Sequence, residues 1–113
     1  MFESVTAVAL TSALTGLSER QSAIANNIAN VNTPNYHAKR VTFEAALAAS
    51  VRAGSGQVTA ATETSQDATN VNGNNVNLDT ETLSNVDTVL RFQFAAEAIN
   101  GQLTSVRAAM RTS

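Results

Sequence analysis

The chain has 113 residues, a formal net charge of −2 and 43% hydrophobic residues, of which few are aromatic. Because nine acidic and seven basic side chains are spread along it, no charged face indicates nucleic acid or an anionic membrane surface as a partner. The absence of cysteine excludes disulfide bonds and thiolate metal sites. The sequence contains no run of 18 apolar residues, so it predicts no direct membrane span. The length predicts a single domain, 1–113.

The N-terminal region carries apolar residues at alternating steps of three and four, the spacing of a coiled-coil seam. The pattern ends in asparagines and Pro34, so we expect a helix over about 3–31. Gln21 interrupts the seam, either as a register-fixing amide or as an amide tolerated at the surface. The seam comprises Ala7, Leu10, Leu14, Leu17, Ile24, Ile28 and Val31.

The C-terminal region predicts a second long helix over about 80–111, with Asp79 as its N-cap and Glu81 in its first turn. Leu78 and Leu83 stand at the two hydrophobic staple positions. Similar lengths and complementary seams favour an antiparallel coiled-coil-like hairpin of the two terminal helices. The second seam comprises Leu83, Val86, Val89 or Leu90, Phe92, Ala96, Ile99, Leu103, Val106 and Met110.

The middle of the chain predicts a short helix over about 42–52, followed by a long, flexible polar connector over about 53–78. We expect the connector to become ordered on assembly with a partner. The predicted fold class is therefore all-α. Gly16 and Gly101 fall inside the predicted long helices and mark either close approaches or tolerated positions.

The sequence indicates no catalytic, cofactor or metal site, and we predict that the chain is not an enzyme. His37 is the only histidine, so nucleophilic catalysis would depend on one imidazole in a turn. The glycine of the Asn72-Gly73 pair suggests a calcium loop, but the expected ligand positions carry Ala68 and Asp79. An Asn-Gly turn explains this segment better.

Asparagines are in excess near the end of the first predicted helix, at Asn26, Asn27, Asn30 and Asn32. One residue is enough to cap a helix end. Since Asn is a weak helix former, we expect these amides to hydrogen-bond a neighbouring backbone or side chain. The alternative is a frayed helix end with Asx turns leading into Pro34.

These asparagines belong to a segment that resembles the N-terminal signature of bacterial flagellar rod and hook proteins, N-[IL]-A-N-x-x-T-P-G-Y. Asn35 replaces the usual glycine, and because Asn tolerates the left-handed region the turn should persist. A second segment, 73–81, is similar to the motif before the C-terminal helix of the family's proximal rod members, which the small size also favours. The matching residues are Asn27, Ile28, Ala29, Asn30, Thr33, Pro34 and Tyr36, and then Asn74, Asn75, Val76, Leu78 and Asp79.

The resemblance implies a structural subunit of the flagellar basal-body rod, polymerising through its terminal helices into the axial drive shaft for motility. It implies export through the flagellar type III apparatus and a location outside the cytoplasmic membrane. The implied partners are copies of the chain and other rod and basal-body proteins, contacted through the two motifs and the helix seams. An alternative is a small secreted helical-hairpin protein of another export system, although its Trp-x-Gly turn is missing because the chain has no Trp.

Overall fold

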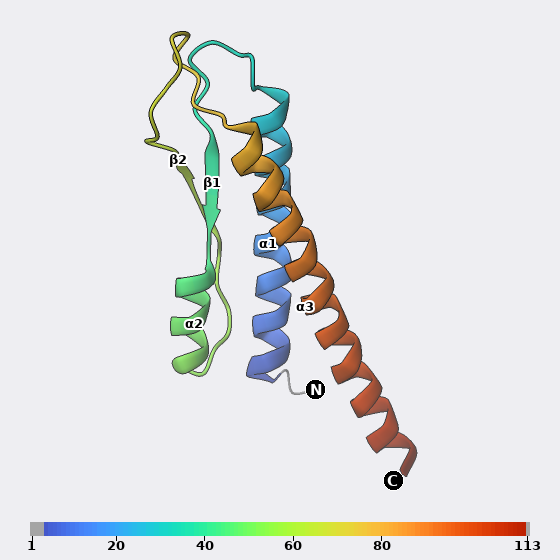
Figure 1. The fold of residues 1–113 in the computed structure, drawn as a ribbon. Coiled ribbons are helices and arrows are strands. Elements are labelled where there is room, and N and C mark those ends of the chain that lie inside the picture. Colours follow the sequence, from blue (N-terminus) through green and yellow to red (C-terminus); the bar gives the residue numbers. More distant parts are fainter. Residues whose placement is uncertain (1–3, 113) are drawn as a thin grey trace.

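The computed structural model describes residues 4–112, which form a long helical hairpin with a small sheet and a short helix beside it (Figure 1). The described part measures 66 × 25 × 16 Å. The elements in chain order are α1 (Val5–Ala29), β1 (Lys39–Thr42), α2 (Glu44–Arg52), β2 (Ala61–Thr64) and α3 (Leu78–Thr112).

The two terminal helices run antiparallel and diverge toward the end where the termini lie (Figure 1). At about 1.5 Å per residue, the 25 residues of α1 span roughly 37 Å and the 35 residues of α3 roughly 52 Å. Because α3 is longer, its last turns extend past the first described turn of α1 (Figure 1). The predicted pair of long terminal helices is therefore present.

Polar side chains determine where both long helices begin. Ser4 accepts a hydrogen bond from the Ala7 amide at 3.0 Å and caps α1. The Asn77 side chain accepts from the Thr80 amide at 3.1 Å and caps α3. The predicted cap, Asp79, is therefore wrong: it lies within the first turn of α3, because the asparagine two residues earlier is an equally good cap.

The fold is mostly helical, as predicted, but it is not strictly all-α, because β1 and β2 form a two-stranded antiparallel sheet. In its register Lys39 lies opposite Thr64, and Thr42 lies opposite Ala61. The strand β2 lies within 53–78, where we expected a flexible connector without secondary structure. The sheet forms because the backbone groups of these two short segments satisfy one another, not because of an apolar pattern.

A small apolar core joins α1 to β1 and to the start of α2. Leu17 and Ala23 from α1 pack with Val41 and Phe43, all with exposed fractions of 9% or less. Phe43, which we expected on the face of a helix beginning at about 42, is instead the residue that precedes α2. Partly buried residues complete the cluster: Ala13, Leu47 and Ala60.

Gly16 marks a close approach and Gly101 does not. A Cβ atom at Gly16 would lie 2.6 Å from Cδ1 of Phe43, whereas one at Gly101 would have no neighbour within 4 Å. The neighbour of Gly16 is thus a ring beside α2 and not the partner helix.

Alanine at these two glycines is expected to have opposite effects on stability. Gly101→Ala should raise the unfolding free energy by about 1 kcal/mol, the usual gain inside an exposed helix. Gly16→Ala should lower the unfolding free energy by about 1 kcal/mol, because the clash with the Phe43 ring costs more than the gain in helix propensity. Urea denaturation measures both, and equal stabilisation by the two substitutions would contradict the packing assigned to Gly16.

Candidate functional site

Asn27 is the centre of a buried hydrogen-bond network at the closed end of the hairpin. Its side chain is fully buried in the last turns of α1. The amide nitrogen donates to the carbonyl oxygen of Lys39 at 3.0 Å and to Oε1 of Glu81 at 2.6 Å. The amide oxygen accepts from the Lys39 backbone N–H at 2.8 Å and from the Tyr36 hydroxyl at 3.4 Å. One side chain therefore ties β1 and α3 to α1.

Glu81, in the first turns of α3, supplies a buried charge to this network and is only 1% exposed. Its second carboxylate oxygen accepts from Nη1 of Arg40 at 3.0 Å. Arg40 also lies 3.9 Å from the carboxylate of Asp67. Because a buried carboxylate is costly unless it is paired and hydrogen-bonded, these contacts hold β1 and α3 in one arrangement.

Asn74 and Asn75, in the segment that precedes α3, also bind backbone groups of distant segments through their side-chain amides. The Asn74 amide nitrogen donates to the carbonyl oxygens of Asn30 and Thr33, both at 2.8 Å. The Asn75 amide oxygen accepts from the Ala38 N–H at 2.7 Å, and its nitrogen donates to two carbonyl oxygens of the segment after β2. The two sequence motifs, far apart in the chain, therefore meet as one network.

The turn after α1 uses the left-handed backbone that its sequence predicted. Asn35 has a φ of 62°, as expected for an asparagine in place of the family's glycine. Its N–H donates to the carbonyl oxygen of Asn72 at 3.0 Å, and a Cβ atom at Gly73 would collide with its side chain. Gly73 itself has a φ of 82°, so this position favours glycine for both its backbone and its neighbour.

Arg20, on α1, binds residues at the start of α2 and at the end of β1. Its guanidinium forms two hydrogen bonds with the Glu44 carboxylate at 2.6 and 2.7 Å, and two more with the carbonyl oxygen of Val41. It also lies 5.0 Å from the centre of the Phe43 ring. Sequence reasoning missed this cluster, because a lone arginine on a polar helix face gives no signal of its partner.

The Arg20–Glu44 pair predicts a pH dependence of stability. Hydrogen bonds from Arg20 lower the pKa of Glu44 from 4.5 to about 2. A lowered pKa means that the ion pair stabilises the folded chain above the ordinary pKa, and that this contribution is lost as the pH falls from about 4.5 to about 2. Since the Glu44 side chain is 44% exposed, solvent screening keeps the contribution small.

We therefore expect Glu44→Gln to lose less stability on acidification than the unsubstituted chain. Urea denaturation at about pH 7 and about pH 3 gives the difference in unfolding free energy for each protein. Glu63→Gln is a matched control, because Glu63 is exposed and makes no ion pair among residues 4–112. Equal losses in the Glu44 variant and the control would contradict the assignment.

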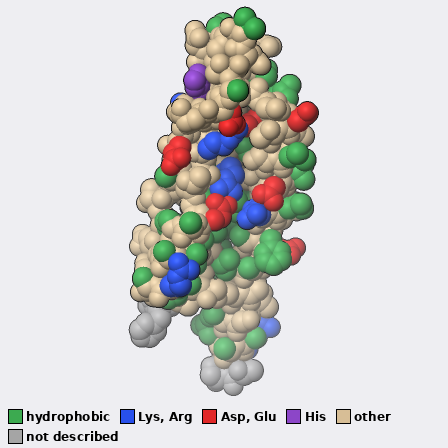
Figure 2. Space-filling view, turned by 60° about the vertical axis from the view of Figure 1, so that its left-hand side comes forward, with side chains coloured by type: hydrophobic (Ala, Val, Ile, Leu, Met, Phe, Trp, Pro, Cys, Tyr) green, Lys and Arg blue, Asp and Glu red, His purple; other side chains and the backbone are tan. Residues whose placement is uncertain are grey.

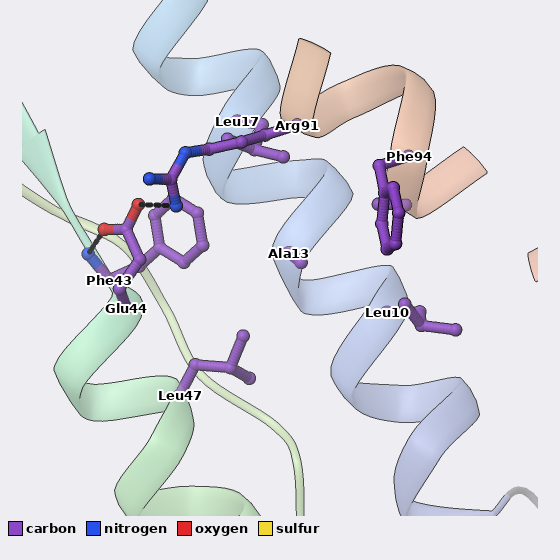
Figure 3. A pocket seen from close by; sticks show the side chains of 9 residues that line it. Leu10, Ala13, Leu17, Phe43, Glu44, Leu47, Arg91 and Phe94 are labelled. Atoms are coloured by element: carbon purple, nitrogen blue, oxygen red, sulfur yellow. Dashed lines mark hydrogen bonds and ion pairs between the residues drawn. The ribbon is translucent and has the colours of Figure 1, made fainter. Parts of the chain in front are cut away.

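A hollow of about 290 Å³ lies between α1, α2 and α3, next to this cluster (Figure 3). Figure 3 shows the guanidinium of Arg91 reaching toward the Glu44 carboxylate, 4.0 Å away, with the Phe43 ring beside this pair, Leu47 beneath the ring and Phe94 on the far side of α1's Ala13. The wall is mainly apolar and is formed by Leu10, Ala13, Leu17, Phe43, Glu44, Leu47, Arg91, Phe94 and Ala95.

The residues of the two motifs divide into a buried and an exposed group. The buried ones bind the chain's own backbone or core: Asn27, Asn74, Asn75 and Val76. Two are half-buried, Asn30 and Tyr36. The exposed ones are Ile28, Ala29, Thr33, Pro34, Leu78 and Asp79. Among the asparagines near the end of α1, Asn27 bonds the backbone of a distant segment, as expected, whereas the Asn30 amide bonds the carbonyl oxygen of Asn26 within the same helix end.

The predicted seam residues are also unevenly buried. Gln21 is exposed, which agrees with an amide tolerated at the surface. Leu17 and Ile24 are buried in the hairpin. The half-buried seam residues are Ala7, Leu10, Leu14, Val31, Val89, Ala96 and Ile99, and Val31 lies beyond the end of α1. The exposed ones are Ile28, Leu83, Val86, Leu90, Phe92, Leu103, Val106 and Met110.

One apolar face was assigned to the wrong side of α3. We expected Leu83, Val86 and either Val89 or Leu90 to continue the seam toward α1. Val89 is half-buried, but Leu83, Val86 and Leu90 lie exposed on the opposite side from the Glu81 and Ala95 positions. Phe94 extends this exposed row and is 78% exposed. The spacing of three and four was a correct signal of a shared face, but it does not tell which face meets α1.

Two further properties of the described residues bear on function. Among residues 4–112, no three or more His, Asp or Glu side chains gather in a group suited to a metal ion. None of the described helices has the length and hydropathy needed to cross a membrane.

Comparison with known proteins places this architecture in a family. Residues 9–37, which include the Asn27–Tyr36 motif, match the family described as flagella basal body rod protein. The chain is 30% identical to the flagellar basal body rod protein FlgB of Bacillus subtilis (strain 168), over 87% of its own length and 87% of that protein. It is 68% identical to FlgB of Borrelia hermsii over 31 residues, which are 27% of this chain and 23% of that protein.

These matches confirm the resemblance that the motifs indicated, and they do not favour a secreted hairpin of another export system. The family is a structural one and is not known for enzymatic activity. The chain belongs to the flagellar basal body rod protein family.

Proposed function

We propose that this structural rod subunit polymerises through its terminal helices into the axial shaft that serves motility. The observation that carries the proposal is a row of large apolar side chains left uncovered on α3, with exposed fractions from 53% to 78%. A row of this kind in a family of assembling subunits indicates a contact with another protein. Its members are Leu83, Val86, Leu90 and Phe94.

The two motifs have separate tasks in this proposal. The buried amides of Asn27, Asn74 and Asn75 hold the subunit in one shape, because each binds backbone groups of a distant segment. The exposed motif residues are then free to contact neighbouring subunits and to set their stagger. Those proposed contacts are Ile28, Ala29, Thr33, Pro34, Leu78 and Asp79.

The partners in this proposal are copies of the chain and other rod and basal-body proteins. The chain reaches them unfolded, through the flagellar type III export apparatus, and folds outside the cytoplasmic membrane. A cysteine-free chain of 113 residues with a small core suits this route, since there is no crosslink to open before export and little tertiary structure to undo.

Electron microscopy of cells deleted for this chain tests the proposal. Rods and filaments should be missing from the deletion strain and should return when a plasmid supplies the chain. Normal basal bodies and flagella in the deletion strain would overturn the proposal.

Ile28→Asp is expected to abolish rod assembly without unfolding the subunit. Ile28 is 39% exposed on α1, so a carboxylate there remains hydrated in the monomer but would be desolvated in a subunit contact. In the complemented deletion strain, immunoblotting should show normal amounts of the variant while microscopy shows at least tenfold fewer rods. Ala25→Asp is a control at another exposed α1 position. Normal rods with Ile28→Asp would remove Ile28 from the interface.

A further inference from the structure

The α3 helix carries two apolar surfaces of opposite charge character, one near each end. The first, which we call the acidic stripe, consists of Leu83, Val86, Leu90 and Phe94. Figure 2 shows hydrophobic side chains along the α3 edge of the molecule, with Asp and Glu side chains among them. At helical spacing, Asp87 lies between the apolar members, where it pairs with Arg91 at 2.9 Å, and Glu97 follows Phe94 by three residues. Two carboxylates and one guanidinium therefore flank this face, and the carboxylate of Glu97 forms no ion pair among residues 4–112.

The second surface, which we call the basic tail, is the part of α3 from 101 to 112. Leu103 and Val106 are 51% and 41% exposed there, and Met110 is also exposed. Arg107 and Arg111 are its charged residues, and the sequence has no acidic residue after Glu97. Within residues 4–112, neither arginine forms an ion pair.

The two surfaces have the same spacing of apolar residues and carry opposite charges. Apolar residues follow at steps of three and four in the stripe, at 83, 86 and 90, and again in the tail, at 103, 106 and 110. Two helix faces with this spacing interdigitate as knobs into holes. Opposite charges beside the two faces would favour this pairing over stripe on stripe or tail on tail.

We infer that the basic tail of one copy docks on the acidic stripe of a second copy. The tail cannot reach the stripe of its own subunit, because both lie on one continuous helix. Leu90 and Val106 are separated by 16 residues, roughly 24 Å along the helix. The contact is therefore heterologous: each copy offers a stripe to one neighbour and a tail to another, which produces an open chain of subunits.

This inference rests on the proposed rod function and names the surfaces that polymerise. Charge reversal tests it in the complemented deletion strain. Arg107→Glu with Arg111→Glu should reduce the number of rods at least tenfold, as should Asp87→Lys with Glu97→Lys. All four substitutions in one chain should restore rods, because the tail and the stripe are again opposite in charge.

A cysteine crosslink tests the contact directly, since the chain has no cysteine of its own. Leu90→Cys with Val106→Cys should give a ladder of disulfide-linked multimers in isolated basal bodies, because a disulfide bridges Cα atoms only up to about 6.8 Å apart and so must join two copies. The matched control is Gln93→Cys with Val106→Cys, since Gln93 is exposed on a neighbouring face of α3. It should give no ladder.

The outcomes separate this inference from the proposed function. If the unsubstituted chain restores rods but both charge-reversed sets do so equally, the docking is wrong and the rod function stands. The docking is also wrong if the fourfold variant remains without rods while circular dichroism shows it folded, or if the control crosslinks as well as the test pair. If the unsubstituted chain restores nothing, the proposed function itself fails.

Discussion

Asn27→Ala is expected to lower the unfolding free energy by about 3 kcal/mol or more, because it leaves several buried groups without partners. The substitution removes hydrogen bonds to both backbone groups of Lys39 and to the carboxylate of Glu81. Glu81 is 1% exposed and, among residues 4–112, would retain only Arg40 as a side-chain partner. A loss of this size is a large part of the 5–15 kcal/mol that stabilises a typical domain.

Asn26→Ala provides the matched control for this prediction. Asn26 is the preceding residue of the same helix and is exposed, so its substitution should change the unfolding free energy by no more than about 0.5 kcal/mol. Urea denaturation followed by circular dichroism gives both values. If the two variants were equally stable, the buried network would not be what holds the closed end of the hairpin together.

The long helices were predictable from the sequence because their signals are local. The seam residues Leu10 to Ile24 repeat at helical spacing, and asparagines with Pro34 mark where α1 ends. The cap of α3 was placed two residues late, since Asn77 and Asp79 are both favourable caps and sequence alone does not rank them. Local chemistry thus determines the elements to within a turn.

The sheet was not predictable for the opposite reason. The strands are four residues each, KRVT and ATET, and every residue of β2 is exposed. Neither strand alternates apolar and polar residues over enough positions to be told from a loop. Their pairing joins segments about 20 residues apart and satisfies backbone groups, which leave no trace in side-chain patterns.

The sequence predicted that asparagine amides form hydrogen bonds, but it did not predict their partners. An excess of asparagines near 26–32 indicated that amides bind something beyond the helix end, but composition does not identify the partner. The partner of Asn27 proved to be the chain's own backbone and the carboxylate of Glu81, which the sequence indicated only as a favourable charge in the first turn of α3. Such partners depend on how distant segments pack, so the structure was needed to find them.

Phe43→Ala is expected to lower the unfolding free energy by about 3–5 kcal/mol, the usual cost of deleting a buried aromatic ring. Phe43 is 5% exposed, packs against Gly16 and lies under the guanidinium of Arg20. Its removal should enlarge the hollow between the three helices and weaken the packing of α2 on α1. Urea denaturation should show the loss, and the variant should accumulate poorly in cells.

Phe94→Ala separates folding from assembly, because it removes the same kind of side chain from the exposed rim of the hollow. Phe94 is 78% exposed, so its loss should change the unfolding free energy by no more than about 0.5 kcal/mol. If Phe94 belongs to the surface on which a neighbouring tail docks, rods should nevertheless become at least tenfold rarer in the complemented deletion strain. A folded Phe94 variant with normal rods would exclude Phe94 from that contact, whereas an unfolded one would assign it to the core with Phe43.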